Sequence, residues 1–321
     1  MKERLLNSRG LFPLIEVARE SRSPLRQRYA AARRGQDTAV LDQLGRRRLF
    51  RYPWRAVARL FGVANPRGPV WGVTMVRNEA PRIERSVLQL LDGGVDIVVV
   101  ADNLSTDETP FVLDDLARKH PVVVLSDSEP AYYQGPKMSR LARAAARCGA
   151  SWIVPFDADE LWYGIDAPLA DRLHSSRANT VIVSMFDFLP PPSINTATDP
   201  YTDFTVRTRT PGTAKVAFRA HLLATIATGN HSVSQPGPSE ADLAVIRHYP
   251  YLSLEHFIEK ARHGSAALSQ TDLPRNVGEH WRAWGEASSP ELLEAWRALV
   301  ATGTVDDPLP SLPFIRSSDA P

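Results

Sequence analysis

Two carboxylates spaced as D-x-D are the side chains of this 321-residue chain best suited to chemistry. Asp157 and Asp159 follow the apolar segment 151–156, which is typical of a buried strand. At a strand end this spacing can direct both carboxylates to one side, where they suit a hard cation such as Mg²⁺ or Mn²⁺. The alternative is a helix cap and a solvated turn. The position of the pair directly after a predicted strand favours a ligand or metal site.

A second acidic loop lies upstream, at residues 102–109. Asp102 directly ends the β-branched segment 96–101, which is typical of a strand, and this position favours a ligand-binding role. Asp107 has the type and place of a turn residue or a helix N-cap. Two acidic loops after two predicted strands indicate one polar site if the strands are neighbours.

Alternating strands and helices would bring these loops together. Such alternation is typical of right-handed βαβ units on a mostly parallel sheet, in which ligands bind outside the carboxyl ends of the strands. The loops that follow residues 76, 101, 125 and 156 are therefore expected to form the site. Strands are predicted at 70–76, 96–101, 122–125, 151–156, 181–186, 215–218 and 220–227, and helices at 79–91, 109–120, 137–148 and 251–264.

Three segments, taken in their order along the chain, resemble glycosyltransferase family 2. They are Thr74 to Glu79, Val98 to Thr109 and Trp152 to Glu160, and they are most similar to the bacterial branch with R-N-E and F-D-x-D-E motifs. The resemblance covers about residues 70–270. It implies an α/β protein of the GT-A fold, with a mostly parallel central sheet flanked by helices and with helical N- and C-terminal extensions. It also implies a nucleoside diphosphate sugar donor and a divalent cation, Mn²⁺ or Mg²⁺.

Carried over by position, the resemblance implies that Asp102 binds the nucleoside base, Asp157 faces the ribose and Asp159 binds the metal. Asn103, Leu104 and Glu108 depart from the D-x-S-x-D-x-T pattern with a late glycine that many members carry, so the nucleotide preference stays open. Other residues implied to bind the nucleotide sugar are Val76, Asn78, Glu79, Asn103, Lys137, Ala158, Arg247 and Lys260. Arg247, Lys260 and Arg262 are candidates to bind the diphosphate. The alternative for these basic residues and for Lys137 is a solvated helix terminus or helix face.

The remaining metal ligand and the general base are expected in the second half of the chain. GT-A enzymes commonly use a downstream histidine, and His231 and His248 both fit by order, although a structural role is the alternative for each. Asp187 follows the predicted strand 181–186 and precedes a long loop at 190–214. It is the first candidate for the base of an inverting displacement, in which a carboxylate takes the proton of the acceptor hydroxyl. The rival candidates are Asp203, Glu240 and Glu255.

The first 67 residues carry most of the positive charge. They contain 16 Lys and Arg but five Asp and Glu, whereas the rest of the chain is acidic. Helical stretches are predicted at 11–33 and 38–61, with aromatic residues after the Arg46–Arg48 run. One interpretation is a solvated extension packed on the acidic domain. Another is peripheral contact with an anionic membrane surface. Nucleic acid is not expected as a partner, because no recognition motif accompanies the charge.

Composition and the positions of turn-forming residues predict the organisation of the chain. The N-P-R-G-P segment indicates a linker between a basic helical extension at 1–67 and a glycosyltransferase domain at 68–270. A helical segment and a loose Pro-rich tail are expected at 271–321. The single cysteine, Cys148, excludes an internal disulfide and suits a reducing compartment. No apolar run reaches the length of about 20 residues that a membrane span needs. A cytoplasmic protein, peripheral at most at the inner membrane face, is therefore expected.

The sequence thus predicts a metal-dependent glycosyltransferase that moves a sugar from a nucleoside diphosphate to an acceptor hydroxyl. The acceptor would be a carbohydrate or a glycolipid, in glycan, polysaccharide or glycolipid assembly. Two alternatives stay open. One is another nucleotide-using enzyme, such as a nucleotidyltransferase, although the glycine-rich phosphate loop that it needs is not found beside Arg77. The other is a non-catalytic protein that binds sugar or nucleotide as a scaffold.

Overall fold

A computed structural model describes residues 68–190, 199–273, 277–301, 304–307 and 310–320 of the chain. The helices predicted at 11–33 and 38–61 lie outside these described residues. The strands of the main sheet are β1 (Val70–Val76), β2 (Ile97–Asp102), β3 (Val122–Ser126), β4 (Trp152–Pro155), β5 (Glu160–Ile165), β6 (Thr180–Asp187), β8 (Lys215–Arg219), β9 (Ser239–Glu240), β10 (Ala244–His248) and β12 (Phe314–Ile315).

This sheet runs in the order β12-β5-β10-β6-β8-β4-β1-β2-β3, with β9 beside β6. β4, β1, β2 and β3 are parallel, and β6 pairs in parallel with β10. β8 is antiparallel to both β4 and β6, so it joins two parallel groups. The predicted mostly parallel sheet is therefore confirmed, and the loops that carry Asp102 and Asp157 leave neighbouring parts of one edge.

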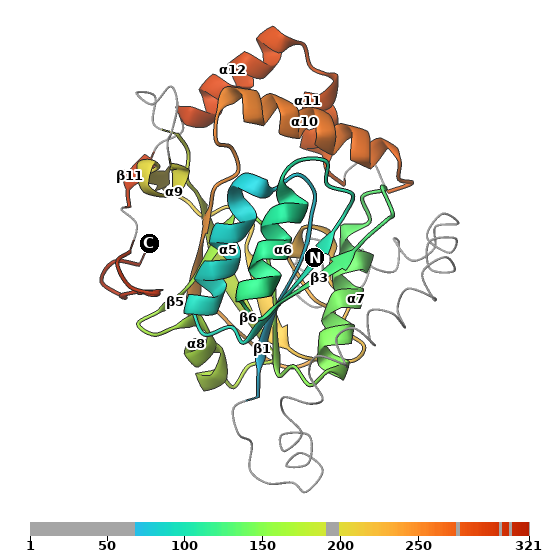
Figure 1. The fold of residues 1–321 in the computed structure, drawn as a ribbon. Coiled ribbons are helices and arrows are strands. Elements are labelled where there is room, and N and C mark those ends of the chain that lie inside the picture. The colour runs from blue at the N-terminus through green and yellow to red at the C-terminus, as the bar shows by residue number, and fades with distance from the viewer. Residues whose placement is uncertain (1–67, 191–198, 274–276, 302–303, 308–309, 321) are drawn as a thin grey trace, which may run out of the picture.

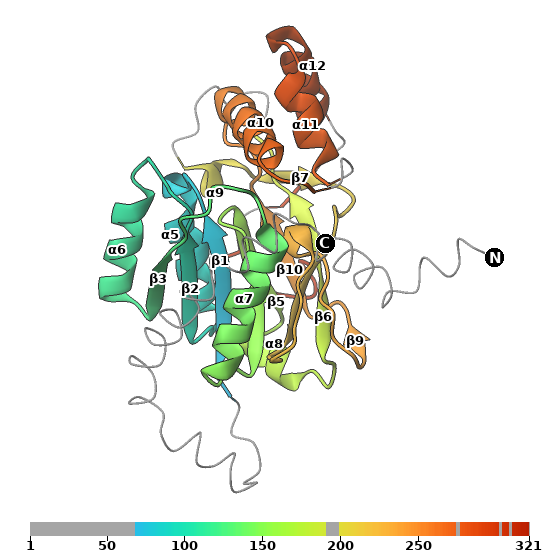
Figure 2. The ribbon, with the colours of Figure 1, turned by 90° about the vertical axis from the view of Figure 1, so that its right-hand side faces the viewer.

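Helices cover both faces of the sheet (Figures 1 and 2). Alternate residues of β2 point into two cores: Val98 and Val100 pack with the helices α5 and α6, and Ile97 and Val99 pack with α7. Three further helices, α10, α11 and α12, lie together over the edge where the parallel strands end (Figure 1). The helices are α5 (Ala80–Asp92), α6 (Thr109–Lys119), α7 (Gln134–Arg147), α8 (Leu169–Ser175), α9 (Pro200–Asp203), α10 (Leu254–Ser269), α11 (Glu279–Glu286) and α12 (Ser289–Val300), with a 3₁₀ turn at Thr228–Asn230.

The structure differs from the sequence prediction at several elements. Residues 160–165 form a strand that was not predicted, whereas residues 220–227 form no strand and contribute only an isolated bridge between Ile226 and Val233. Helix α10 does not end at Gly264 but continues to Ser269. A Cβ on Gly264 would lie 3.2 Å from the Trp281 ring, so this glycine serves the close approach of α11 rather than a helix end.

The C-terminal segment is held on the domain at several points. β11 (Thr304–Asp306) pairs antiparallel with β7 (Val206–Thr208), and β12 pairs in parallel with β5. Asp307 follows β11 and forms ion pairs with Arg207, at 2.7 Å, and with Arg247. The expectation of a loose tail is therefore wrong for these residues, because backbone pairing and a buried ion pair attach them.

No helix within the described residues has the length and apolar composition that crossing a membrane requires.

Candidate active site

Asp159 is the centre of a charged cluster at the carboxyl edge of the sheet. It follows β4 and is 5% exposed. Its Oδ2 lies 2.5 Å from the Lys260 Nζ, 3.4 Å from the His248 Nε2 and 3.7 Å from an Arg82 guanidinium nitrogen. Burial by itself would raise the pKa of Asp159, but the three nearby cations outweigh it and lower the pKa well below the usual range. Asp159 is therefore an anion held by residues from α5, β10 and α10.

His248 links Asp159 to Asp187. β6 and β10 are parallel neighbours whose register places Asp187 directly beside His248, and the His248 Nδ1 lies 2.7 Å from the Asp187 Oδ1. Burial by itself would lower the pKa of His248, but the two carboxylates outweigh it and raise the pKa to about 9. Asp187 keeps about a third of its side chain exposed. Three residues of the predicted site therefore form one connected string with an accessible carboxylate at its end.

Asp157 lies beside this string but is held by other partners. Its Oδ2 accepts a hydrogen bond from the Lys215 Nζ at 2.6 Å, and its Oδ1 accepts from the side chains of Gln134 and Asn230, each at 3.1 Å. The side chain is 28% exposed. Asp157 is thus fixed in place while part of it faces solvent.

Lys215 also contacts the second buried carboxylate of the motif. Its Nζ lies 2.7 Å from an oxygen of Glu160, which is fully buried and accepts a hydrogen bond from the Trp162 indole at 3.0 Å. Burial raises the pKa of Glu160 to about 7, with Lys215 opposing the shift. Between them, Asp157 and Glu160 raise the pKa of Lys215 although burial would lower it. One lysine therefore neutralises two carboxylates.

Replacing Lys215 by methionine should lower the free energy of unfolding by about 3–5 kcal/mol, because a buried charge pair loses one partner. Urea unfolding followed by circular dichroism measures this loss. Lys119→Met is the matched control: Lys119 pairs with Asp115 on the exposed surface of α6, so its loss should leave the unfolding midpoint nearly unchanged. Equal midpoints for the two variants would contradict the assigned role of Lys215.

The loops after β1 and β2 are tied to each other next to this cluster. The register of the two strands places Val76 beside Asp102. Asn78 has a left-handed backbone with φ of 56°, and its side-chain oxygen accepts from the Thr106 N–H at 2.8 Å. The Asp102 Oδ1 accepts from the Ser105 N–H at 3.2 Å. These contacts hold the half-buried Asp102 at the carboxyl edge of the sheet.

Two residues that were predicted to bind the nucleotide sugar are buried and form hydrogen bonds with a loop. The Asn103 side chain donates to the carbonyls of Asp127 and Glu129, at 3.1 and 2.6 Å. Lys137 is 1% exposed; its Nζ lies 2.9 Å from an Asp127 carboxylate oxygen and donates to the Glu129 carbonyl at 2.7 Å. The alternative of a solvated helix-terminal lysine is therefore wrong. Both residues hold the loop after β3 through their contacts with Asp127 and Glu129.

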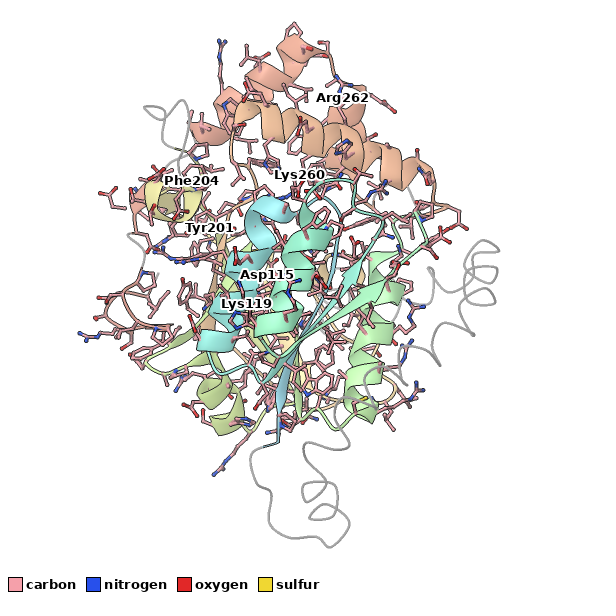
Figure 3. The ribbon with its side chains drawn as sticks, viewed as in Figure 1. Asp115, Lys119, Tyr201, Phe204, Lys260 and Arg262 are labelled. Carbon is pink, nitrogen blue, oxygen red and sulfur yellow. The ribbon has the colours of Figure 1, made fainter. Side chains whose placement is uncertain are left out.

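The other predicted residues divide into those near Asp159 and those away from it. Glu79 pairs with Arg82, and burial raises the pKa of Glu79 although the charges of Arg82 and Lys260 oppose the shift. Ala158 is buried between Asp157 and Asp159. Arg262 is on the same helix as Lys260 (Figure 3). It donates to the carbonyls of Gly285 and Ala287.

Arg247 is not brought to the cluster. It is 2% exposed, pairs with Asp307 and lies with its guanidinium carbon 4.4 Å from the centre of the Phe188 ring. Neighbouring residues of a strand point to opposite faces, so Arg247 and His248 cannot both face Asp159. We assign Arg247 a structural contact instead of the expected contact with the diphosphate.

His231 directly follows the turn at Thr228–Asn230, next to Asn230, which donates to Asp157. Its Nδ1 lies 3.0 Å from the Ala214 carbonyl, and within the described residues no hydrogen bond or ion pair joins it to Asp159. Within the described residues, no group of three or more His, Cys, Asp or Glu side chains is arranged to hold a metal ion. His248 is therefore the histidine that the structure brings to Asp159.

The rival bases lie away from the string. Glu240 is an exposed residue of β9 that accepts a hydrogen bond from Ser176 at 2.6 Å. Glu255 is exposed in the first turn of α10, and Asp203 caps the short α9 through the Asp199 N–H. Asp187 alone of the four candidates contacts His248 among the described residues.

Sequence reasoning missed Arg82, Lys215 and Glu160. Arg82 lies three residues after Glu79, a spacing that places two side chains on one helix face, so the Glu79–Arg82 pair was open to prediction. Lys215 begins a strand of buried apolar residues, and a lysine in such a strand needs an anionic partner. The sequence alone did not name that partner, because Lys215 and Asp157 are 58 residues apart.

Comparison with known proteins agrees with this geometry. Residues 73–222, from β1 into the loop after β8, match the family described as Glycosyl transferase family 2. The matched range contains Asp102, Asp157, Asp159 and Asp187, whereas His248 and Lys260 follow it. No curated protein matches the chain.

Several solved structures are similar to part of the chain. S. aureus TarS 1–349 is 14% identical, with a TM-score of 0.37 over 68% of this chain and 70% of that chain. The same protein in complex with UDP-GlcNAc is 14% identical, with a TM-score of 0.37 over 73% of each chain. Glucosyl-3-phosphoglycerate synthase from Mycobacterium tuberculosis, in complex with Mn²⁺, UDP and phosphoglyceric acid, is 17% identical, with a TM-score of 0.35 over 64% of this chain and 80% of that chain.

These three structures are too distant to indicate which substrates this chain uses. The sequence match to the family is independent of them, and it spans the segment that carries both acidic loops. The mixed, mostly parallel sheet flanked by helices is the architecture expected for that family. The chain therefore carries a glycosyl transferase family 2 domain at residues 73–222, on a mixed, mostly parallel sheet flanked by helices.

Proposed function

We propose that the chain is a metal-dependent, inverting glycosyltransferase that uses a nucleoside diphosphate sugar. The observation that carries the proposal is the string Asp159–His248–Asp187 at the carboxyl edge of the sheet, beside the loop of Asp102. It supplies a buried anion, a histidine and an accessible carboxylate in one place. We assign the reaction to residues 68–270, with 1–67 as a basic extension and 271–321 as a C-terminal segment.

The oxygen and nitrogen ligands of Asp159 and His248 fit a divalent cation, Mn²⁺ or Mg²⁺. The Asp159 Oδ2 and the His248 Nε2 are 3.4 Å apart, close to the separation of about 3 Å between adjacent ligands of an octahedral Mg²⁺. Asp187 engages the other ring nitrogen, which orients the imidazole as partners of metal-bound histidines do. Binding would displace one imidazole proton and move the Lys260 ammonium away from Asp159; Lys260 is 24% exposed and has room to turn. Asp157 is already held by Lys215, so we do not propose it as a ligand.

The chain's own residues account for the rest of the reaction. Asp102 and the loop around Asn78 bind the nucleoside, and Asp157 faces the ribose. A bound cation would neutralise the charge that develops on the leaving diphosphate. Lys260 lies where it can add positive charge to the same group. Asp187 takes the proton of the acceptor hydroxyl as that oxygen attacks the anomeric carbon, and a single displacement of this kind inverts the centre.

We also propose the setting of the reaction. The acceptor is a carbohydrate or a glycolipid, in glycan, polysaccharide or glycolipid assembly. The protein works in the cytoplasm, without nucleic acid, and the 16 basic residues of segment 1–67 give it peripheral contact with the inner membrane face. This segment lies outside the described residues, so its charge rather than its structure supports the contact.

A donor panel tests the proposed function. The full-length protein is incubated with UDP-, GDP-, dTDP- and CDP-sugars, with and without Mn²⁺, and released nucleoside diphosphate is measured. We expect one nucleotide class to be turned over, by hydrolysis when no acceptor is present, and only with the cation. Turnover without any cation would contradict the metal assignment. Release of sugar 1-phosphate in place of a nucleoside diphosphate, with transfer of the nucleoside monophosphate, would indicate a nucleotidyltransferase.

A further inference from the structure

We propose that a corner of the domain, formed by the Leu222–Leu223 loop and the C-terminal half of α7, docks on an anionic lipid bilayer. This inference deepens the membrane contact proposed above, but it rests on described residues of the domain rather than on segment 1–67. It is also independent of the transfer chemistry. We call this surface the leucine corner.

Two adjacent leucines are exposed at the leucine corner. Leu222 is 53% exposed and Leu223 is 77% exposed, in the loop between β8 and the turn at Thr228–Asn230. The other strongly exposed large apolar side chain among the described residues, Phe111 at 71%, lies on α6. Single exposed apolar residues are ordinary, but two together at the tip of one loop form a small apolar projection that needs a reason.

The loop that carries the leucines is firmly attached to α7. The next residue, Ala224, is fully buried, and its carbonyl accepts a hydrogen bond from an Arg143 guanidinium nitrogen at 3.0 Å. Two residues later the Ile226 N–H donates to the Ser139 Oγ at 2.7 Å. The leucines therefore stand out from an ordered base, and their exposure is a fixed feature of this surface.

Basic residues surround the apolar projection. Arg140, Arg143 and Arg147 follow the helical spacing that places side chains on one face of α7, and Arg143 touches the loop directly. On the other side, Arg219 ends β8 three residues before Leu222 and donates to the carbonyls of Ser176 and Ala178. The exposed Arg177 lies between those two carbonyls. Two carboxylates of this end of the domain keep their negative charge: Asp96 accepts from the Val70 N–H at 2.9 Å, and Glu240 accepts from Ser176.

The basic segment joins the domain at this same corner. The Ser151 Oγ donates to the Gly68 carbonyl at 2.6 Å, and the Ala220 N–H donates to the Ser151 carbonyl at 2.9 Å. Gly68, the first described residue after the segment with 16 basic and five acidic residues, is therefore joined through Ser151 to Ala220, two residues before Leu222. Leucines that enter the interface and cations that face lipid headgroups are the combination by which peripheral proteins bind anionic membranes.

Docking at the leucine corner would turn the active edge away from the lipid. β8 begins at Lys215, beside Asp157, and ends at Arg219, so the two sites lie at opposite ends of a strand of about 13 Å. A bound enzyme would then reach its acceptor from the aqueous side. This geometry favours a soluble saccharide or a long glycan chain over a short lipid headgroup.

Vesicle sedimentation tests the leucine corner. Full-length protein, without donor or cation, is mixed with vesicles of phosphatidylcholine that contain about one third phosphatidylglycerol, and with phosphatidylcholine vesicles alone. We expect binding to the anionic vesicles that weakens with salt, and a partition coefficient at least about tenfold lower for the double variant Leu222→Ser/Leu223→Ser. Phe111→Ser, which removes an equally exposed ring on α6, should bind like the parent protein.

Two outcomes would overturn the proposal. One is failure of the parent protein to bind anionic vesicles. The other is equal binding by the parent and the double variant, which would assign any attachment to segment 1–67 alone. Nucleoside diphosphate release by the double variant should equal that of the parent, because both leucines are remote from Asp159; this assay separates failure of the leucine corner from failure of the proposed reaction. Melting curves confirm that both variants are folded.

Discussion

Replacing Asp159 by asparagine should lower nucleoside diphosphate release at least about a hundredfold, with the fold intact. The exchange keeps the size of the side chain but removes the anion that lies near Lys260, His248 and Arg82. Without it the proposed cation loses its carboxylate ligand, and the diphosphate faces three positive groups whose positions are no longer fixed by a shared partner. Steady-state turnover at several Mn²⁺ concentrations measures the loss.

The control for this variant is Asp114→Asn. Asp114 pairs with Arg118 on the exposed face of α6, so the same chemical change there should leave turnover and the melting temperature unchanged. Turnover of Asp159→Asn at the parent rate, in a sample with a normal circular dichroism spectrum, would contradict the placement of the reaction at Asp159.

Replacing Asp187 by asparagine should reduce kcat by about 10²–10⁴-fold while the KM for the donor changes little, because the acceptor loses its general base. The amide can still contact the His248 ring, so the imidazole keeps a hydrogen-bonding neighbour. The measurement is kcat at saturating donor and acceptor, over a series of Mn²⁺ concentrations.

The metal series separates two roles of Asp187. Loss of a residue that only orients a metal-bound histidine typically weakens metal binding by about 10–100-fold. Raising the Mn²⁺ concentration by a similar factor would then restore the rate. A general base leaves the rate low at every Mn²⁺ concentration. Full rescue by Mn²⁺ would therefore reduce Asp187 to an orienting residue. Glu255→Gln, at an exposed rival position on α10, should retain the parent kcat.

Much of the fold follows from local pattern. β1 and β2 are runs of mostly buried residues, those of β2 largely β-branched, and the sequence predicts both within one residue of their ends. The 220–227 segment has a similar apolar content, but Leu222 and Leu223 are exposed in a loop, which composition alone does not reveal. β5 was missed because its first residue, Glu160, belongs to the acidic motif and hides the strand that follows.

The candidate site was only partly open to sequence reasoning. Asp102 ends β2 and Asp159 follows β4, and the parallel pairing of both strands with β1 brings the two residues to one edge of the sheet. Their positions after predicted strands were therefore enough to predict a shared site. Strand alternation could have separated His248 from Arg247, because adjacent residues face opposite ways. The contact of Lys260 with Asp159 joins residues 101 apart and depends on how α10 packs, so only the three-dimensional structure supplies it.

The most direct test of the account is a thermal-shift panel of UDP, GDP, dTDP and CDP, each with and without Mn²⁺. A ligand at 100 times its dissociation constant stabilises the folded state by about 2.7 kcal/mol, which such a melting curve detects. We predict that one nucleotide raises the melting temperature in the presence of Mn²⁺, and that Asp159→Asn abolishes this shift. Unchanged melting temperatures with all four nucleotides, in a well-folded sample, would contradict the assignment of the Asp102 and Asp159 edge as a nucleotide-sugar site.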